Sequence, residues 1–535
     1  MKLNDSELKD KALWENAGFR LPGFDREEVR KNTKTRPVWI HFGVGNIFRA
    51  FPAAVQQQLL EEGKADTGII AAEGYDYEII EKMNKPHDDL SLLVTLKADG
   101  TIEKTVVGSI VESLTVDSKN EEDFARLKEI FRSQSLQMVS FTITEKGYSL
   151  VNAKGELLPD VAADFEAGPI APLSYIGKLA SLCYERYKNG ALPVALVSMD
   201  NCSHNGTKLF MAVNEFAKQW EQKKLVDAGF EAYINSDKVA FPWSMIDKIT
   251  PRPDESVKKM LSDAGFEDTE PVITAKNTYV APFVNAEQPQ YLVIEDAFPN
   301  GRPQLDAAGV IFTDRETVDK VEKMKVCTCL NPLHTALAIF GCLLSYTAIY
   351  KEMNDPQLRS LVEKIGYQEG LPVVVNPGII KPEDFIDEVL NVRVPNPFMP
   401  DTPQRIATDT SQKLSIRFGE TIKAYINSPD LSISDLKLIP LVLAGWCRYL
   451  MGIADDGEVF ELSSDPMLET VCPYVKDIRL GQEGPFGEML KPILSNKDIF
   501  GVDLYEAGLG ELVENYFAEM VKGKGAVRAA LVKYV

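Results

Sequence analysis

Three side chains that could together move a proton lie close along one stretch of the sequence. Lys325, Asn331 and His334 fall within ten residues of one another, in a chain with only four histidines. A lysine or an imidazole can transfer a proton, and a carboxamide can donate hydrogen bonds to an oxyanion, so this set could act without a metal. The same residues would also fit a capped core helix with a surface lysine beside it.

The local sequence predicts how these side chains are positioned. Pro332 suits the first position of a helix and Asn331 suits the cap before it, while the apolar pattern predicts a helix over residues 333–353. Asn331 and His334, three residues apart, would then share one face of that helix. Lys325 would approach them from the preceding segment.

A glycine turn follows a short buried strand near the start of the chain. Residues 37–42 predict the strand, and Gly43 and Gly45 predict the turn. The apolar pattern that follows predicts a helix to about residue 62. In a dinucleotide-binding turn the first glycine makes the bend, and the second lets a pyrophosphate approach the main chain. Phe48 stands where the third small residue of that motif belongs, so the motif is incomplete.

Two acids follow the second predicted strand, over residues 67–72. Glu73 ends this strand and Asp76 lies three residues further on. An acid here could accept hydrogen bonds from an adenosine ribose and would repel a 2′-phosphate, which favours NAD over NADP. Either acid could do this, and either could be an ordinary surface carboxylate.

These segments together resemble one family, the polyol-specific long-chain dehydrogenases, which include mannitol dehydrogenase and the hexuronate reductases. The resemblance runs from about residue 37 to past residue 417, and its motifs occur in family order. They lie at residues 41–51, 142–148, 197–206, 241–251, 294–303, 324–334 and 392–397. Several ordered motifs are far more specific than any single one.

The resemblance implies roles for particular residues. It makes Lys325 the general acid/base, and it makes Asn201 and Asn331 the pair that holds the substrate oxygen as charge develops on it. Burial beside a nicotinamide cation would favour the neutral amine of such a lysine. The further substrate-binding positions that it implies are His334, Arg393 and Asp247. The cofactor-binding positions that it implies, for NAD, are Gly43, Gly45, Asn46, Ile47, Phe48, Arg49, Glu73, Asp76, Thr144 and Glu145.

The sequence departs from the family pattern in two places. The spacing from Lys325 to Asn331 is one residue longer than is usual, so either a bulge before Pro332 absorbs the extra residue or Lys323 is the working lysine. The preceding methionine favours Lys325. The glycine turn carries Arg49-Ala-Phe51 without the histidine of mannitol-type members, and so looks more like the hexuronate reductases.

The glycine turn therefore favours fructuronate or tagaturonate as substrate, with fructose and mannitol as the alternative. A uronate would need a cation near its carboxylate, for which Arg393 and Lys381 are candidates.

Composition agrees with a soluble cytoplasmic enzyme. The resemblance implies that its partner is a small sugar acid or polyol, and we expect a monomer or small homo-oligomer. The net charge is −21, with 58 basic and 79 acidic residues, and no basic cluster is large enough to track nucleic acid. The N-terminus lacks the apolar core of a signal peptide. The apolar run at residues 333–350 contains several polar residues, which favours a buried helix over a membrane span.

Seven cysteines are too few and too scattered for a disulfide scaffold. Cys327 and Cys329 flank the proposed site, but a zinc ion would need more ligands, and His334 and Cys342 are the only ones nearby. We interpret these cysteines as small apolar groups and expect no metal.

The order of predicted elements indicates an α/β fold. Alternating strands and helices over residues 1–310 predict a Rossmann-like doubly wound domain with a hairpin around Gly100, and long helical patterns over residues 311–535 predict a mostly α-helical substrate-binding and catalytic domain. Two other functions fit this outline: a dinucleotide-binding sensor without activity, and a metal-dependent polyol dehydrogenase.

Overall fold

The computed structural model describes residues 1–252 and 255–535. The chain divides into two compact units, one formed by Met1–Leu96 with Thr101–Asp319 and the other by Lys97–Gly100 with Lys320–Val535. The first unit continues through Asp319, past the predicted division after residue 310.

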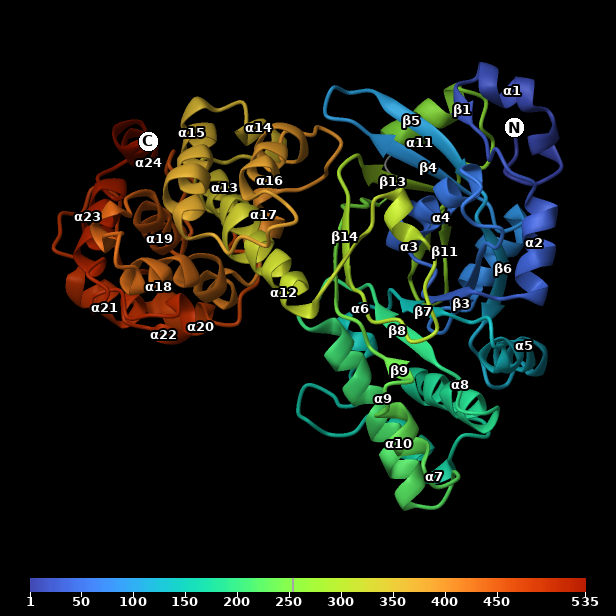
Figure 1. Cartoon of the computed structure of the whole chain (residues 1–535). Coiled ribbons are helices and arrows are strands. Elements are labelled where there is room, and N and C mark those ends of the chain that lie inside the picture. Colours follow the sequence, from blue (N-terminus) through green and yellow to red (C-terminus); the bar gives the residue numbers. More distant parts are fainter. Residues whose placement is uncertain (253–254) are drawn as a thin grey trace. The chain divides into compact units, whose positions relative to one another are not determined.

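A six-stranded parallel sheet forms the centre of the first unit (Figure 1). In spatial order its strands are β6 (Ile110–Thr115), β3 (Ile69–Glu73), β2 (Trp39–Phe42), β7 (Met138–Phe141), β8 (Val194–Ser198) and β9 (Val239–Ala240). Trp39 pairs with Ile69 on one side and Met138 on the other. This is the order of a doubly wound dinucleotide-binding sheet, whose switch point lies between β2 and β7. The fold class predicted for this part of the chain is confirmed.

Alternation along the strands explains why both faces of this sheet are covered. Phe42, Phe141 and Leu196 face one core, which is closed by α5 (Glu121–Arg132), α8 (Tyr175–Lys188) and α9 (Asn205–Gln222). Trp39 and Val197 face the other core, which contains α3 (Asn46–Ala50) and α4 (Pro52–Glu61). Strands buried on both faces explain their nearly continuous apolar sequences.

Two smaller sheets complete the first unit. The predicted hairpin around Gly100 is present as β4 (Ser91–Leu96) and β5 (Ile102–Val107), which belong to a four-stranded sheet with β1 (Phe19–Arg20) and β13 (Phe283–Glu287). The other sheet contains β10 (Ser244–Asp247), β14 (Tyr291–Glu295) and β15 (Ile311–Thr313). The remaining elements include α1 (Lys11–Asn16), α2 (Arg26–Thr35), α6 (Thr144–Gly147), α7 (Pro159–Ala167), α10 (Phe230–Ile234), α11 (Glu255–Asp263), β11 (Val272–Ile273) and β12 (Tyr279–Val280).

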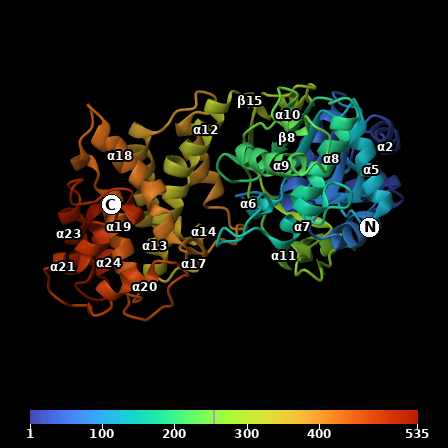
Figure 2. The same ribbon diagram turned by 90° about the horizontal axis from the view of Figure 1, so that it is seen from below.

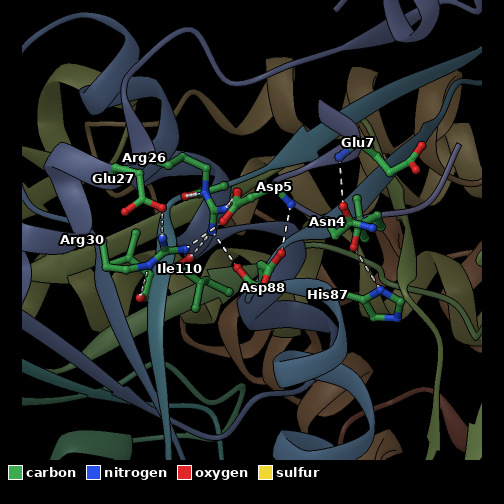
Figure 3. Close-up of polar contacts among 12 residues, drawn as sticks. Asn4, Asp5, Glu7, Arg26, Glu27, Arg30, His87, Asp88 and Ile110 are labelled. Carbon is green, nitrogen blue, oxygen red and sulfur yellow. Dashed lines mark hydrogen bonds and ion pairs between the residues drawn. The ribbon is translucent and has the colours of Figure 1, made fainter. Parts of the chain in front are cut away.

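A partly buried charge cluster connects the first residues of the chain to this unit (Figure 3). The carboxylate of Asp5 pairs with both Arg26 and Arg30. Arg26, which is buried, also donates to the carbonyls of Asp88 at 2.8 Å and Ile110 at 3.1 Å. Its Nε atom donates to the carbonyl of Gly108 at 2.9 Å, so each of the three guanidinium nitrogens bonds to a protein oxygen, which offsets the cost of burying the charge.

The second unit consists of helices (Figures 1 and 2). Its α-helices are α13 (Asn331–Leu343), α14 (Ile349–Glu352), α15 (Pro356–Lys364), α16 (Pro382–Glu388), α17 (Pro403–Ile406), α18 (Glu420–Asn427), α19 (Leu438–Tyr449), α20 (Leu468–Val471), α21 (Gly487–Leu494), α22 (Lys497–Phe500), α23 (Gly510–Met520) and α24 (Ala526–Tyr534). The chain enters this unit along α12 (Arg315–Met324). π-Helical turns interrupt the pattern at η5 (Lys325–Cys329), η6 (Ile365–Gly370), η8 (Val389–Arg393) and η10 (Ser415–Gly419). The predicted helical character of this part of the chain is confirmed.

The long helix predicted over residues 333–353 is wrong in its length. Helix α13 stops at Leu343 because Ser345 adopts a left-handed conformation with φ of 62°. The N–H of Tyr346 then bonds back to the carbonyl of Gly341 at 2.8 Å, which closes the helix end. Serine carries no strong sequence signal for this conformation, so the apolar pattern ran on past the true end.

Glu369 sets the start of α19. Its carboxylate accepts hydrogen bonds from the N–H groups of Lys437, Leu438 and Ile439 at 2.7 to 2.8 Å. These are donors that a helix start leaves without an intrahelical partner. The sequence pattern predicts a helix over residues 433–453, but the helix begins at Leu438, where a side chain distant in sequence caps it.

Glu352 is a fully buried carboxyl in the second unit. Neither of its oxygens has a hydrogen-bond partner among the described residues. It lies so near α13 that a Cβ on Gly341 would come within 2.2 Å of its Oε1 atom. Burial raises the pKa of Glu352 to about 9, so the carboxyl is protonated at neutral pH.

One helical stretch among the described residues, Arg315–Leu343, is long and apolar enough to cross a membrane. Within its most apolar window, 78% of the residues are buried inside the protein. This is the pattern of a core helix, as the sequence predicted.

Candidate active site

The glycine turn after β2 has the geometry that its sequence predicts. Gly43 has a φ of 98°, and a Cβ placed on it would lie 2.2 Å from the carbonyl oxygen of Thr142, so only glycine fits. A Cβ on Gly45 would meet nothing within 4 Å. The space beside Gly45 is therefore open to a ligand that approaches the main chain.

The predicted helix after this turn is present but divided. It breaks at Phe51 into α3 and α4, and Pro52 starts the second piece. Ile47 is half-buried. Arg49 points inward, donating to the carbonyl of Ala281 at 2.8 Å and to Oδ1 of Asn46 at 3.0 Å. These contacts fasten the turn to the first unit.

Phe48 fills the position that a third small residue would occupy. Its ring is fully buried and stacks on His41, with centroids 4.0 Å apart. Both ring nitrogens of His41 bond to hydroxyls, Nδ1 to Ser140 at 2.6 Å and Nε2 to Thr142 at 2.8 Å. Burial lowers the pKa of His41 to about 3, so it is a neutral support beneath the turn. Only the main chain of Phe48 could meet a cofactor.

The two acids after β3 are placed differently. The Glu73 carboxylate accepts hydrogen bonds from the N–H of Val44 in the glycine turn at 2.9 Å and from that of Tyr75 at 2.8 Å. It also accepts one from Asp76 N at 3.1 Å. Asp76 is buried, and its own carboxylate accepts from the hydroxyl of Thr274. Glu73 is therefore the acid that adjoins the glycine turn.

A strained residue lies at the carboxyl end of β7. Thr144 has a φ of 64°, which is unusual for a β-branched side chain. Asp200, from the end of β8, holds it by accepting from Thr144 N at 2.8 Å and Ile143 N at 3.0 Å, and it also accepts from the hydroxyl of Tyr148. Glu145 is exposed and pairs with Lys208. Strain of this kind is common at functional sites.

Asn201 lies exposed just beyond the carboxyl end of β8. The nearby carboxamide of Asn205 is buried, and its Nδ2 atom donates to the carbonyl of Asp200 at 3.0 Å. Asp247, at the end of β10, is also buried in the first unit. Gly43, Thr144 and Asn201 thus all follow strand ends of the parallel sheet, where ligands bind in doubly wound folds.

In the second unit, Lys325 begins the π-helical turn η5 and is buried, with 4% of its surface exposed. Lys323, two residues earlier on α12, is exposed. A π turn contains one more residue than an α-helical turn, so it is the bulge predicted to absorb the extra residue before Pro332. The choice of Lys325 over Lys323 agrees with this burial and stays a prediction.

Asn331 is not the helix cap that its sequence predicts. It is the first residue of α13, and Leu330 occupies the cap without a side-chain cap hydrogen bond. Leu330, between the π turn and α13, has a φ of −127°, and its N–H bonds back to the carbonyl of Lys325 at 3.1 Å. Asn331 and His334 both belong to the first turn of α13, as predicted, and both are half-buried.

His334 lies among charged groups. Its Nε2 atom is 3.7 Å from Oδ2 of Asp401, which also pairs with Arg405. Burial lowers the pKa of His334 to about 4; Asp401 opposes this shift, and the positive charges of Arg417, Arg405 and Arg393 add to it. The imidazole is therefore neutral at pH 7, so one ring nitrogen can donate a hydrogen bond and the other can accept one.

Two arginines of this group have defined surroundings. Arg393 is buried at the end of η8. Arg417 donates to the hydroxyl of Thr335 at 2.5 Å, and that hydroxyl donates to the carbonyl of Asn331 at 2.9 Å. Burial lowers the pKa of Arg417 to about 10, which leaves it charged at neutral pH. The second unit thus brings Asn331, His334 and several cations together.

The cysteines near this site are thiols. Cys329 and Cys342 are buried, and burial raises the pKa of each to about 12. Cys327 is half-buried. Protonated thiols are small apolar groups, in agreement with their interpretation from the sequence.

Sequence reasoning gave no role to Asp200, Asn205, Asp401 or Arg417. Asp200 and Asn205 flank Asn201 within one motif, so the motif itself was the available signal. Asp401 and Arg417 are distant from His334 in sequence, and only the folded helices bring their charges to it.

Comparisons with known proteins match almost the whole chain. A family model described as the mannitol dehydrogenase Rossmann domain matches residues 38–307, and one described as the mannitol dehydrogenase C-terminal domain matches residues 317–521. A D-mannonate oxidoreductase of Thermotoga maritima is 56% identical, covering 100% of this chain and 99% of the relative. A mannitol 2-dehydrogenase of Pyrenophora tritici-repentis is 30% identical, covering 93% of this chain and 81% of the relative.

Two solved structures have the same fold as this chain. A D-sorbitol dehydrogenase in substrate-free form has the same fold, with a TM-score of 0.82 at 24% identity over 99% of this chain and all of the other. A Pseudomonas fluorescens mannitol 2-dehydrogenase, in ternary complex with NAD and D-mannitol, has a TM-score of 0.69 at 25% identity over 100% and 99% of the two chains. The resemblance predicted from the ordered motifs is confirmed, and the chain belongs to the mannitol dehydrogenase family.

Proposed function

We propose that this protein is a cytoplasmic, NAD-dependent oxidoreductase that interconverts fructuronate and D-mannonate. The observation that carries the choice of an acid substrate is the group of cations around His334. Arg393, Arg405 and Arg417 all lie near enough for their charges to act on this imidazole, and the charge of Asp401 opposes them. An excess of guanidinium charge suits a carboxylate substrate better than a neutral polyol. The 56% identity to a D-mannonate oxidoreductase supports the same substrate.

The glycine turn fits a dinucleotide. The open space beside Gly45 would admit a pyrophosphate against the main chain, and Glu73 adjoins the turn as an acceptor for ribose hydroxyls. The similar mannitol 2-dehydrogenase binds NAD. Bound NAD(H) would supply or accept the hydride.

The side chains of the protein would transfer the proton and stabilise the charge on the reacting substrate oxygen. Lys325 gives a proton to the substrate oxygen during reduction of the ketone and takes it from the hydroxyl during oxidation. Asn201 and Asn331 donate hydrogen bonds to that oxygen as negative charge develops. His334, neutral at pH 7, binds a substrate hydroxyl, and Arg393 binds the carboxylate.

The test of this function is turnover of NADH with fructuronate, tagaturonate and fructose in parallel, with and without a chelator. We expect fructuronate to be reduced fastest and the chelator to have no effect. Turnover of fructose alone would exclude the uronate assignment, and loss of activity with the chelator would exclude a metal-free mechanism. A protein that binds NADH but reduces none of the three substrates would fit a sensor.

Replacing Arg393 by alanine tests the carboxylate contact. Loss of a hydrogen-bonded charge pair costs about 1.5–3 kcal/mol, so we expect KM for fructuronate to rise roughly tenfold or more, with KM for NADH unchanged. The control is Arg479→Ala, because Arg479 is exposed in the same unit. Equal KM values in the two variants would remove Arg393 from the site.

Replacing Gly45 by alanine tests the cofactor position. Gly45 has a φ of −80°, which alanine also adopts, and its surroundings are open, so folding should be unaffected. If a pyrophosphate uses that space, the added methyl should weaken NADH binding roughly tenfold, which fluorescence titration measures. Gly23→Ala, at another open glycine, is the control. Unchanged NADH affinity in the Gly45 variant would contradict the assignment.

A further inference from the structure

Asn201 itself is exposed, but the main chain that carries it is held from two sides. Asp200, the preceding residue, sends its carboxylate across to the end of β7, where it bonds to the N–H groups of Ile143 and Thr144. Its backbone carbonyl accepts from the N–H of Cys202 at 2.9 Å and from Nδ2 of Asn205 at 3.0 Å. The segment on which Asn201 sits is therefore fixed by its neighbours.

Asn205 makes several further bonds around this segment. Besides the carbonyl of Asp200, its Nδ2 atom lies 3.3 Å from the carbonyl of Ser198 and 3.0 Å from that of Ser244. Its Oδ1 atom accepts from the N–H of Ser244 at 3.0 Å and from that of Gly206 at 2.8 Å. One buried carboxamide thus joins the end of β8, the start of α9 and β10.

The residues packed around Asn205 restrict how far its carboxamide and the start of α9 can move. A Cβ on Gly206 would lie 2.5 Å from the carbonyl oxygen of Phe241, so α9 starts in close contact with the chain that leads into β10. Ser244 also donates from its hydroxyl to the carbonyl of Ser198 at 2.5 Å. At the other strand end, the strained backbone of Thr144 persists because Asp200 bonds to it.

We propose that Asn205 and Asp200 are positioning residues for catalysis, holding Asn201 and Thr144 at the carboxyl edge of the sheet. This inference rests on the proposed function, in which the Asn201 carboxamide donates to the reacting oxygen. Preorganised donors accelerate a reaction only when supporting residues fix them, and a displacement of about 1 Å can cost roughly 100-fold in rate.

A double-mutant cycle tests the role of Asn205. In the wild-type background, Asn205→Ser should lower kcat for fructuronate reduction by roughly 10- to 100-fold while the Kd for NADH changes less than about threefold. In an Asn201→Ala background, the same substitution should cost less than about twofold, because the side chain it positions is already gone. The control is Asn214→Ser, which removes another hydrogen-bonded asparagine from α9.

Two results would overturn the proposal: an unchanged kcat in Asn205→Ser, or an equal loss of kcat in both backgrounds, which would show a general structural role. If Asn205→Ser does not fold, Ser244→Ala removes only the hydroxyl contacts of the same network and is tested in the same two backgrounds. Failure of the proposed function is recognised separately, because wild-type protein would then not reduce fructuronate.

Discussion

Lys325→Ala protein is expected to bind NADH normally and to reduce fructuronate roughly 100- to 10,000-fold more slowly than wild type, which is the range for loss of a general acid/base. Lys325 is buried at the first position of a π-helical turn, six residues before Asn331. Steady-state kinetics and fluorescence titration of NADH measure the two effects separately.

Lys323→Ala provides the matched control, because Lys323 is exposed two residues earlier on α12. It should retain wild-type kcat. A large loss of kcat in Lys323→Ala with an active Lys325→Ala protein would show that the other lysine transfers the proton. If both variants remain active, the lysine mechanism fails even though the family assignment stands.

Glu352→Gln is expected to stabilise the protein, and more so as the pH rises. The folded carboxyl has a pKa of about 9, whereas a carboxyl in the unfolded chain titrates near 4.5. Between these values the unfolded state releases a proton that the folded state retains, so folding stability falls as pH increases. At pH 7 this costs on the order of 3 kcal/mol, and the neutral amide avoids it.

Urea unfolding between pH 4 and pH 9 measures this effect. The free energies of unfolding of the two proteins should be similar near pH 4, and the advantage of the variant should grow up to about pH 9. Glu420→Gln, a change of the same kind at an exposed glutamate in the same unit, is the control and should have no such pH dependence. A parallel pH dependence in wild type and Glu352→Gln would show that Glu352 ionises normally.

Much of the first unit could be predicted because its signals are local. The run at residues 37–42, the two glycines and the following apolar pattern each reflect a single element, and the structure has β2, the turn and α3–α4 in those places. The apolar runs at residues 136–144, 193–200 and 290–295 likewise predict strands, and the structure has β7, β8 and β14 there. Continuous apolar runs suit strands that are buried on both faces.

The errors concern features that depend on distant contacts or on rare backbone conformations. The start of α19 depends on Glu369, which lies far away in sequence. The end of α13 depends on a left-handed serine at Ser345. The π turn at Lys325 leaves the hydrophobic pattern unchanged, so only the family spacing pointed to an extra residue there.

The same limit applies to the candidate site. Residue types and motif order identified Asn201, Asn331, His334 and the lysine as candidates. They did not predict that Asp200 reaches across to the end of β7, or that several arginines surround His334. Such relations arise only when strands and helices that are separate in sequence are packed together.

The position of Glu73 has a consequence for redesigning coenzyme preference. Exchanging the acid after the second strand for a neutral or basic residue is the obvious route to accepting a phosphorylated ribose. Here that carboxylate also holds the N–H groups of Val44, Tyr75 and Asp76. Its removal would leave three buried or partly buried donors without their acceptor and loosen the glycine turn itself. A successful exchange would need a second substitution that supplies a new acceptor to the turn.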